Sequence, residues 1–302
     1  MNIAAIIVTY NRSDKLYNSV DSLFKKTIEP KYVVIVDNNS TDNTQDVIKC
    51  LENKYPQVKS IKTKRNIGGA GGFCVGLKYA YELGSSHFWI MDDDSYATDN
   101  SLSKLIKGYN ELSELHKVGF LCSRVNWIDN NICEMNQPEP VWNWMRCFSA
   151  DMQAIQVQSC SFVSCFFSRE VLEEHGLPLD EFFIWFDDAE FTKRIARHYP
   201  CFCILDSIVI HDTPVNKGVY FALVNDNNLW KFSYGAKNES WYKFKKESPL
   251  HWLIYIIEKN YQMHQGSVSI KNRFKINIKF IEGVFSRRRI KSVKDFDLSN
   301  YL

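Results

Sequence analysis

Long apolar runs are missing from this sequence, and so is an excess of charge. The run LHWLIYII from Leu250 is interrupted by His251 and falls short of the about 20 residues that a transmembrane helix needs. The N-terminus has no basic segment and soon turns polar, so neither a signal peptide nor a membrane span is predicted. The formal net charge is only +2, which argues against nucleic acid as a partner. We expect a protein that is soluble or bound to a surface.

Paired cysteines are missing as well. The nine cysteines are an odd number and include no CxxC pair. Cys201 and Cys203 alternate within an apolar run, so a strand would point both to the same side. We interpret the cysteines as reduced core thiols of a cytoplasmic protein, in preference to a disulfide framework or a zinc site.

The first half of the chain alternates short apolar runs with amphipathic segments. The first helix is predicted from Ser13 to Lys26. Four apolar runs are predicted to be strands: IAAIIVTY, YVVIVD, VKSIKT and HFWIMD. This order is typical of an α/β fold with a mostly parallel, doubly wound sheet, which binds ligands at the carboxyl ends of its strands.

The second half of the chain has a looser pattern. A helix is predicted near Asn100 to Leu115 and a loop from Asn136 to Asp151. Three strands are predicted, within VGFLCSRVNW, SCSFVSCFFSRE and CFCILDSIVIHD, and a strand end that runs into a helix is predicted within FFIWFDDAEFTKRIARH. The chain is predicted to be helical from Val219. We therefore place a boundary near residue 215, between a domain of residues 1–215 and a helical region of residues 216–302.

Three consecutive carboxylates end the fourth predicted strand. Like charges this close repel one another unless a positive charge lies among them. In a strand, Asp92 and Asp94 would point to the same side while Asp93 faces away. Two converging carboxylates without a nearby cysteine suit Mg²⁺ or Mn²⁺. The alternative is an acidic turn that caps a helix.

A glycine-rich stretch, RNIGGAGGF at residues 65–73, follows a strand and opens a helix. Its glycines let a phosphate or sugar approach the backbone, and a helix N-terminus favours negative charge. The stretch matches neither GxGxxG nor a P-loop, but together with the acidic triplet it suggests a diphosphate ligand. Arg65 is either a side-chain contact of that ligand or a solvated surface residue.

The stretch FDDAEF puts three acids, Asp187, Asp188 and Glu190, in the first turn of a helix. The helix dipole alone explains acids at this place. Four aromatic residues precede or join them: Phe182, Phe183, Trp185 and Phe186. A carboxylate held in such a dry cleft can act as a general base. His211 ends a predicted strand and is either a metal ligand or a structural residue.

Together the motifs resemble the inverting glycosyltransferases of family 2 with the Rossmann-like GT-A fold, in the branch of bacterial galactofuranosyltransferases and related rhamnosyltransferases. The resemblance covers about residues 3 to 240 and rests on six motifs in order: VTYNR, VDNNSTDNT, RNIGGAGGF, MDDDS, FDDAEF and IVIHD. The branch usually has Trp where this chain has Phe186, with Trp185 adjacent. The stretch YGAKN resembles a family element that usually reads Arg-Asn.

The resemblance implies a role for each matched residue. Asp92, Asp94 and His211 are expected to bind the metal, and Asp188 to be the catalytic base. Three residues are expected to position the acceptor or the donor sugar: Trp185, Asp187 and Glu190. Eight residues are expected to bind the donor nucleotide: Thr9, Arg12, Asp37, Arg65, Asn66, Gly68, Gly69 and Asp93.

The implied reaction is metal-dependent, inverting transfer of galactofuranose from UDP-galactofuranose onto a lipid-linked saccharide, in the synthesis of a surface polysaccharide such as O-antigen, capsule or cell wall. A dTDP-rhamnose-dependent rhamnosyltransferase is the alternative within the family. A non-catalytic nucleotide-sugar-binding protein, a nucleotidyltransferase and a phosphohydrolase are alternatives of other classes. The basic, aromatic C-terminal region either meets the anionic inner face of the cytoplasmic membrane or is a solvated tail.

Overall fold

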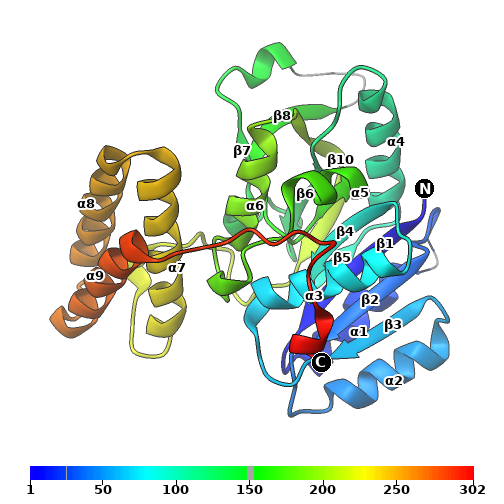
Figure 1. Ribbon diagram of the computed structural model, residues 1–302, viewed down its shortest axis with the longest axis horizontal. Helices are drawn as coiled ribbons and strands as arrows, with labels where there is room; N and C mark the ends of the chain where they lie inside the picture. The colour runs from blue at the N-terminus through cyan, green and yellow to red at the C-terminus, as the bar shows by residue number, and fades with distance from the viewer. Residues whose placement is uncertain (25, 148–152) are drawn as a thin grey trace.

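A ten-stranded sheet runs through the molecule and is covered by helices on both faces (Figure 1). The computed structural model describes residues 1–24, 26–147 and 153–302. The strands are β1 (Ile3–Thr9), β2 (Tyr32–Asp37), β3 (Val58–Lys62), β4 (His87–Asp92), β5 (Ser95–Ala97), β6 (Leu121–Trp127), β7 (Glu139–Pro140), β8 (Ala154–Ser159), β9 (Cys165–Ser168) and β10 (Cys201–His211).

The helices pack in two layers and one separate group. Helices α1 (Ser13–Asp21), α2 (Thr44–Lys54) and α4 (Ser101–Ser113) share a core with one face of the sheet. Helices α3 (Gly68–Glu82), α5 (Arg169–His175) and α6 (Asp187–Ala196) share a core with the other face. The separate group consists of α7 (Leu229–Tyr242), α8 (Pro249–Gln265) and α9 (Ile270–Phe285), which stand beside the sheet (Figure 1).

The predicted parallel sheet is confirmed for the first four strands. The order is β3-β2-β1-β4-β9-β6-β10-β8-β7, and β1 pairs in parallel with β2 and β4. All seven residues of β1 are buried, as expected for a strand that is covered on both faces. Beyond β4 the sheet is mixed, because β9 lies antiparallel between β4 and β6. The carboxyl ends of β1, β2, β4, β6 and β10 still meet at one edge.

Some predicted elements differ from the structure. The stretch FFIWF is not a strand end: Phe182 closes a short 3₁₀ turn, Asp180–Phe182, and Phe183, Trp185 and Phe186 have positive φ angles. An extended strand excludes such positive φ angles. The first helix ends at Asp21 rather than at Lys26. The predicted loop after Asn136 contains the short strand β7, and its end at residues 148–151 lies outside the described residues.

The segment after α9 is not helical as predicted, apart from one short turn, and returns to the sheet domain. Val293 and Phe296 are buried in the core around α3, and the backbone N of Lys64 donates to the carbonyl O of Tyr301 at 2.9 Å. In Figure 1 this tail crosses from α9 to the region of α3. The helical group is therefore tied to the sheet domain from both of its ends.

The eight cysteines whose surroundings are described are free thiols, and Cys201 and Cys203 are both buried in the sheet.

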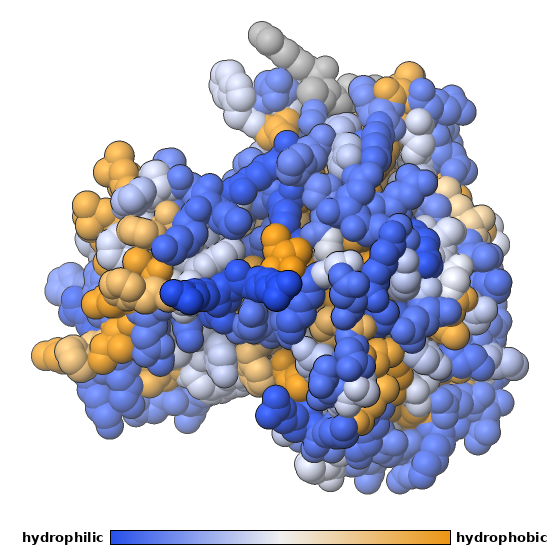
Figure 2. All heavy atoms as spheres, in the orientation of Figure 1, coloured by the Kyte–Doolittle hydropathy of each residue, from blue (hydrophilic) through white to orange (hydrophobic). Residues whose placement is uncertain are grey.

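Within the described chain, no helix has the length and apolar composition to cross a membrane. Hydrophobic residues nevertheless gather on the outside of α8 and α9, at the left edge of Figure 2.

Helix α3 approaches β1 and β2 closely at Gly76, where a Cβ would lie 2.5 Å from Ile6 Cγ2 and 3.0 Å from Val36 Cγ2. We predict that Gly76→Ala lowers the free energy of unfolding by about 1–3 kcal/mol, because these core side chains cannot move aside. Urea denaturation measures this change. Gly69→Ala in the same helix is the matched control, since its Cβ would meet only Phe73 at 4.0 Å. Equal losses in both variants would contradict the packing argument.

Candidate active site

A cavity of about 770 Å³ opens where the carboxyl ends of β1, β4 and β10 meet. Its size lies within the usual range for small-molecule sites. Among the described residues, it is lined by twelve of the fifteen predicted site residues: Thr9, Arg12, Asn66, Gly68, Gly69, Asp92, Asp93, Asp94, Trp185, Asp187, Asp188 and His211. Residues from both halves of the sheet thus face one space.

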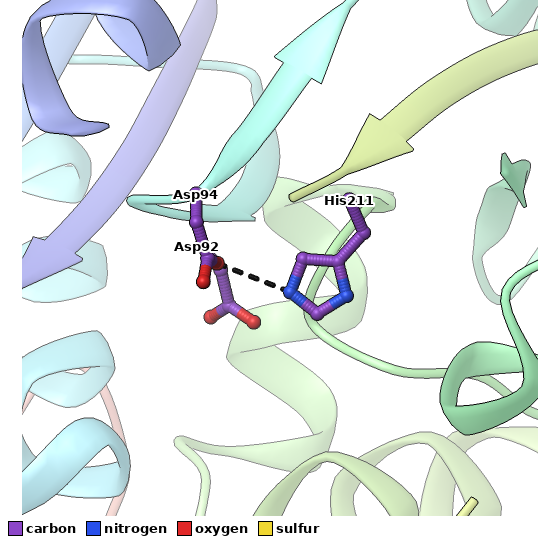
Figure 3. Close-up of side chains that lie close together, drawn as sticks. All are labelled: Asp92, Asp94 and His211. Carbon is purple, nitrogen blue, oxygen red and sulfur yellow. Dashed lines mark hydrogen bonds and ion pairs between the residues drawn. The ribbon is translucent and has the colours of Figure 1, made fainter. Parts of the chain in front are cut away.

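Asp92, Asp94 and His211 form a compact cluster in this cavity (Figure 3). One potential ligand atom from each residue lies within 4.8 Å of the other two. The arrangement follows from the chain path, because β5 turns back antiparallel along β10 and pairs Ser95 with His211. Two carboxylates and one imidazole are a donor set that fits a divalent cation such as Mn²⁺.

His211 is held in an orientation that suits metal binding. Its Nδ1 lies 2.7 Å from the side-chain oxygen of Asn136, and its Nε2 lies 3.0 Å from Asp94 Oδ1. A hydrogen bond from Nδ1 to Asn136 leaves Nε2 to act as the ligand. Burial lowers the pKa of His211, but the hydrogen bond and charge of Asp94 outweigh burial and raise it to about 10. Without a cation, the two residues therefore form an ion pair.

Arg12 supplies a second positive charge to the acidic triplet. Its guanidinium donates a hydrogen bond to Asp94, and its Nε lies 3.9 Å from Asp93 Oδ1. Asp93 was expected to face away, but it lines the same cavity. The reason is that β4 ends at Asp92, so the strand alternation no longer applies to the turn that follows. Burial raises the pKa of the Asp93 carboxyl to about 7.

Asp187 and Asp188 face the cavity from the first turn of α6. Asp188 Oδ1 accepts a hydrogen bond from the backbone N of Ala189 at 2.7 Å. Burial raises the pKa of the Asp188 carboxyl to about 6. Burial, together with the charge of Asp188, raises the pKa of Asp187 well above its usual value. A carboxyl group with a pKa near 6 is suited to accept a proton near neutral pH.

The loop before α6 is held in a strained conformation by Asn238 of α7. The Asn238 side-chain nitrogen lies 2.9, 3.2 and 2.9 Å from the carbonyl oxygens of Phe182, Ile184 and Trp185. Asn238 is fully buried, and Trp185 has a left-handed backbone. Such strain persists only where the surroundings fix it. The YGAKN stretch thus fixes the backbone of this loop through the side chain of Asn238.

The glycine-rich turn fits directly against this loop. The backbone N of Ala70 donates to the Phe183 carbonyl oxygen at 3.2 Å. Gly68 has a φ of +74°, and a Cβ there would lie 2.1 Å from the same oxygen. Gly68 and Gly69 also line the cavity. The turn therefore makes room for the backbone of this loop, which the sequence analysis did not predict.

Three predicted site residues lie outside the cavity wall. Asp37 is fully buried and accepts a hydrogen bond from the backbone N of Ser40 at 2.8 Å. Arg65 is exposed. Glu190 is buried and pairs with Arg194 of the same helix at 2.9 Å.

The lining residues that the sequence analysis did not assign to the site include Asn38, Asn136, Trp230 and Lys231. Asn38 is part of the quoted VDNNSTDNT motif, so a polar residue at a strand end was a usable signal. Lys231 comes from the start of α7, whose return across the cavity no local pattern reveals. Burial and the charge of Arg12 lower the pKa of Lys231, which places its ammonium group among the charges of the site.

Comparison with known proteins identifies the class. The family described as "Glycosyl transferase family 2" matches residues 4–176, so the chain belongs to this family and is a glycosyltransferase. Galactofuranosyltransferase GlfT1 of Mycobacterium tuberculosis is 26% identical over 223 residues, which cover 70% of each chain.

Solved structures agree with a GT-A fold. GalNAc-T7 with UDP, GalNAc and Mn²⁺ superposes with a TM-score of 0.61 at 14% identity; the match covers 97% of this chain and 55% of GalNAc-T7. S. aureus TarS 1-349 in complex with UDP-GlcNAc superposes with a TM-score of 0.59 at 16% identity, and this match covers 94% and 82% of the two chains. This chain thus spans little more than half of GalNAc-T7.

Metal affinity should depend on pH through His211. A cation at Nε2 must displace the proton that Asp94 stabilises, so binding releases a proton. Because the pKa of His211 is about 10, we predict that the Kd for Mn²⁺ falls by about tenfold per pH unit between about pH 6.5 and 8. Titration calorimetry at several pH values measures this slope. A His211→Asn variant should bind Mn²⁺ more weakly and lose most of the slope, and an unchanged slope would rule out His211 as a ligand.

Removal of the Asn238 amide should disturb the site as well as the fold. We predict that Asn238→Ala costs about 1–3 kcal/mol of unfolding free energy, because three carbonyl groups lose a donor. It should also reduce turnover by more than about tenfold, since small displacements of reacting groups are costly. The matched control is Asn272→Ala, which removes a buried amide of α9 that donates to Asp226 at 2.9 Å. Equal losses of turnover in both variants would contradict a positioning role.

Proposed function

We propose that the protein transfers galactofuranose from UDP-galactofuranose onto a lipid-linked saccharide during the synthesis of a surface polysaccharide. The observation that carries this proposal is the placement of the Asp92, Asp94 and His211 cluster and of Asp188 in one cavity. The likeness to GlfT1 supports galactofuranose as the sugar. UDP in the GalNAc-T7 structure and UDP-GlcNAc in the TarS structure support a UDP-linked donor.

The donor diphosphate lies, in this proposal, between the acidic cluster and the glycine-rich turn. Asp92, Asp94 and His211 would hold a divalent cation, which neutralises the charge of the departing nucleoside diphosphate. Lys231 and Arg12 line the same cavity, and Arg12 donates to Asp94 of the cluster. Asp37 and Thr9, which are paired in register at the ends of β2 and β1, are proposed to mark the nucleoside end of the groove.

The acceptor hydroxyl loses its proton to the Asp188 carboxylate as its oxygen attacks the anomeric carbon. The new carbon–oxygen bond forms on the face opposite the diphosphate, whose bond to the anomeric carbon breaks, so the configuration inverts. Trp185 and Trp230 offer aromatic surfaces to the sugar rings. Glu190 pairs with Arg194, so a contact with a sugar hydroxyl would have to share or replace this ion pair.

The acceptor is proposed to be lipid-linked, and the protein to act in the cytoplasm at the inner face of the membrane. The cavity wall includes exposed apolar residues, Met135, Val215, Val219 and Trp230, which suit a substrate with an apolar part. A dTDP-rhamnose donor is the alternative within the family, and parallel assays with both donors decide between them.

The general base is tested with Asp188→Asn. We predict that turnover falls by about 10²–10⁴-fold, because the proton acceptor is lost, while nucleotide binding remains. The wild-type rate should fall below about pH 6, where the Asp188 carboxyl is protonated. The assay measures UDP release with and without acceptor. Release that needs no acceptor would indicate a phosphohydrolase, and an unaffected Asp188→Asn variant would favour a non-catalytic binding protein.

The role of Lys231 is tested by comparing UDP, which carries phosphate groups, with uridine, which carries none. If its ammonium group meets the diphosphate, Lys231→Met should weaken UDP binding by about tenfold and leave uridine binding unchanged, because only UDP carries the charge. Lys237→Met is the matched control on the same helix, since Lys237 lies 3.9 Å from Glu282 and outside the cavity wall. Calorimetry with both ligands separates the outcomes, and equal effects on UDP and uridine would exclude a phosphate contact.

A further inference from the structure

Helices α8 and α9 each present a row of apolar side chains to the outside. We call these ten exposed residues the α8/α9 apolar face; they are Leu250, Leu253, Ile254, Ile257, Tyr261, Ile270, Phe274, Ile278, Ile281 and Phe285. Spacings of three and four residues put each row on one side of its helix. Ile270 is 84% and Phe285 is 78% exposed. Figure 2 shows hydrophobic residues along this edge of the molecule.

The opposite side of the same helices is also apolar. Tyr255 and Met263 of α8, and Ile276 and Phe280 of α9, are buried in the core that these helices share with α7. The fold of the helical group therefore does not need the outer rows. A helix with apolar residues on both sides is normally covered on both, and an apolar patch that spans two helices marks an interaction surface.

Positive charge is concentrated beside this face. Helix α9 contains four Lys and Arg and one Glu, a formal charge of +3, whereas the whole chain carries +2. Among the described residues, no ion-pair partner is found for Lys271, Lys275 or Arg287. Two copies of this face would bring like charges together, which opposes a symmetric dimer. An anionic surface instead complements both the charge and the apolar rows.

The basic C-terminal region was predicted either to meet a membrane or to be a solvated tail, and part of it is occupied by contacts within the chain. Lys291 pairs with Asp180 at 2.7 Å, Lys294 pairs with Glu173 at 2.9 Å, and Arg288 donates to a backbone carbonyl. These contacts fasten the tail to the sheet domain. They hold α9, and with it the apolar face, firmly beside the cavity domain.

We propose that the α8/α9 apolar face docks on an anionic lipid bilayer. The two helices would lie in the plane of the interface, with their apolar rows at the boundary of headgroups and acyl chains and their lysines among the anionic headgroups. This docking is independent of the transfer reaction. If the proposed lipid-linked acceptor is correct, docking would keep the enzyme on the surface where that acceptor resides.

Vesicle sedimentation of the full chain, without donor or acceptor, tests the proposal. We expect binding to vesicles of phosphatidylcholine mixed with phosphatidylglycerol, weaker binding at high salt, and little binding to phosphatidylcholine alone. The double variant Phe274→Ser, Phe285→Ser should bind at least about tenfold more weakly. Leu115→Ser is the matched control, because Leu115 is 68% exposed and lies at the end of α4. Circular dichroism verifies that all variants fold.

A variant with fewer lysines separates the electrostatic contribution to vesicle binding from the apolar contribution. Lys271→Gln with Lys275→Gln should weaken binding to anionic vesicles by roughly fivefold per lysine and should reduce the salt dependence. Equal binding to neutral and anionic vesicles would overturn the electrostatic part of the proposal. A concentration-dependent dimer that the Phe274→Ser, Phe285→Ser variant abolishes, without vesicle binding, would overturn it in favour of a second copy of the chain. A monomer that binds no vesicle would also overturn it.

Discussion

Asp94 and His211 meet because the chain reverses directly after β4 and runs back along β10. This contact joins the two halves of the sheet at the edge where the cavity opens. Three adjacent carboxylates would otherwise repel one another, and burial would make that repulsion worse. Arg12 and the protonated His211 compensate the charge. The fold therefore tolerates the acidic triplet because two positively charged side chains lie against it.

The other wall of the cavity depends on the helical group. Asn238 of α7 holds the left-handed turn that aims Asp187 and Asp188 into the cavity, and Trp185 packs edge-on against Phe232 of the same helix. The helical group is therefore part of the site rather than an appendage. Since α7 also packs on α9, the proposed catalytic carboxylate and the α8/α9 apolar face are connected through one packed unit.

The sequence was sufficient for the features that depend on local pattern. Strands β1 to β4 and β10 and the helix that starts at Asp187 were predicted, because each follows from an apolar run that ends in polar residues. The approach of Asp92 to His211 was implied by the family resemblance rather than by local pattern. The predictions failed where distant contacts decide. Asp93 turns toward Arg12 because β4 stops one residue earlier, and FFIWF is not a strand because Asn238, more than fifty positions away, fixes it.

Residue type alone also did not reveal which charged side chains form ion pairs within the chain. Glu190 is expected to position a sugar, and the structure pairs it with Arg194, one turn away on the same helix. The sequence left open whether the basic tail meets a membrane or is solvated, and it did not reveal that Asp180 and Glu173 bind two of its lysines. Asn136 and Lys231 enter the site from segments without any distinctive motif. Their positions follow from the tertiary fold alone.

The central claim, a metal-dependent nucleotide site in this cavity, is tested most directly by thermal unfolding with nucleotides. The protein would be melted with UDP, dTDP, GDP or ADP, each with and without Mn²⁺, beside an Asp92→Ala, Asp94→Ala variant. The account predicts that UDP raises the melting temperature only with Mn²⁺ and only in the unsubstituted protein. Stabilisation by UDP that persists in the variant, or no stabilisation by any nucleotide, would contradict it.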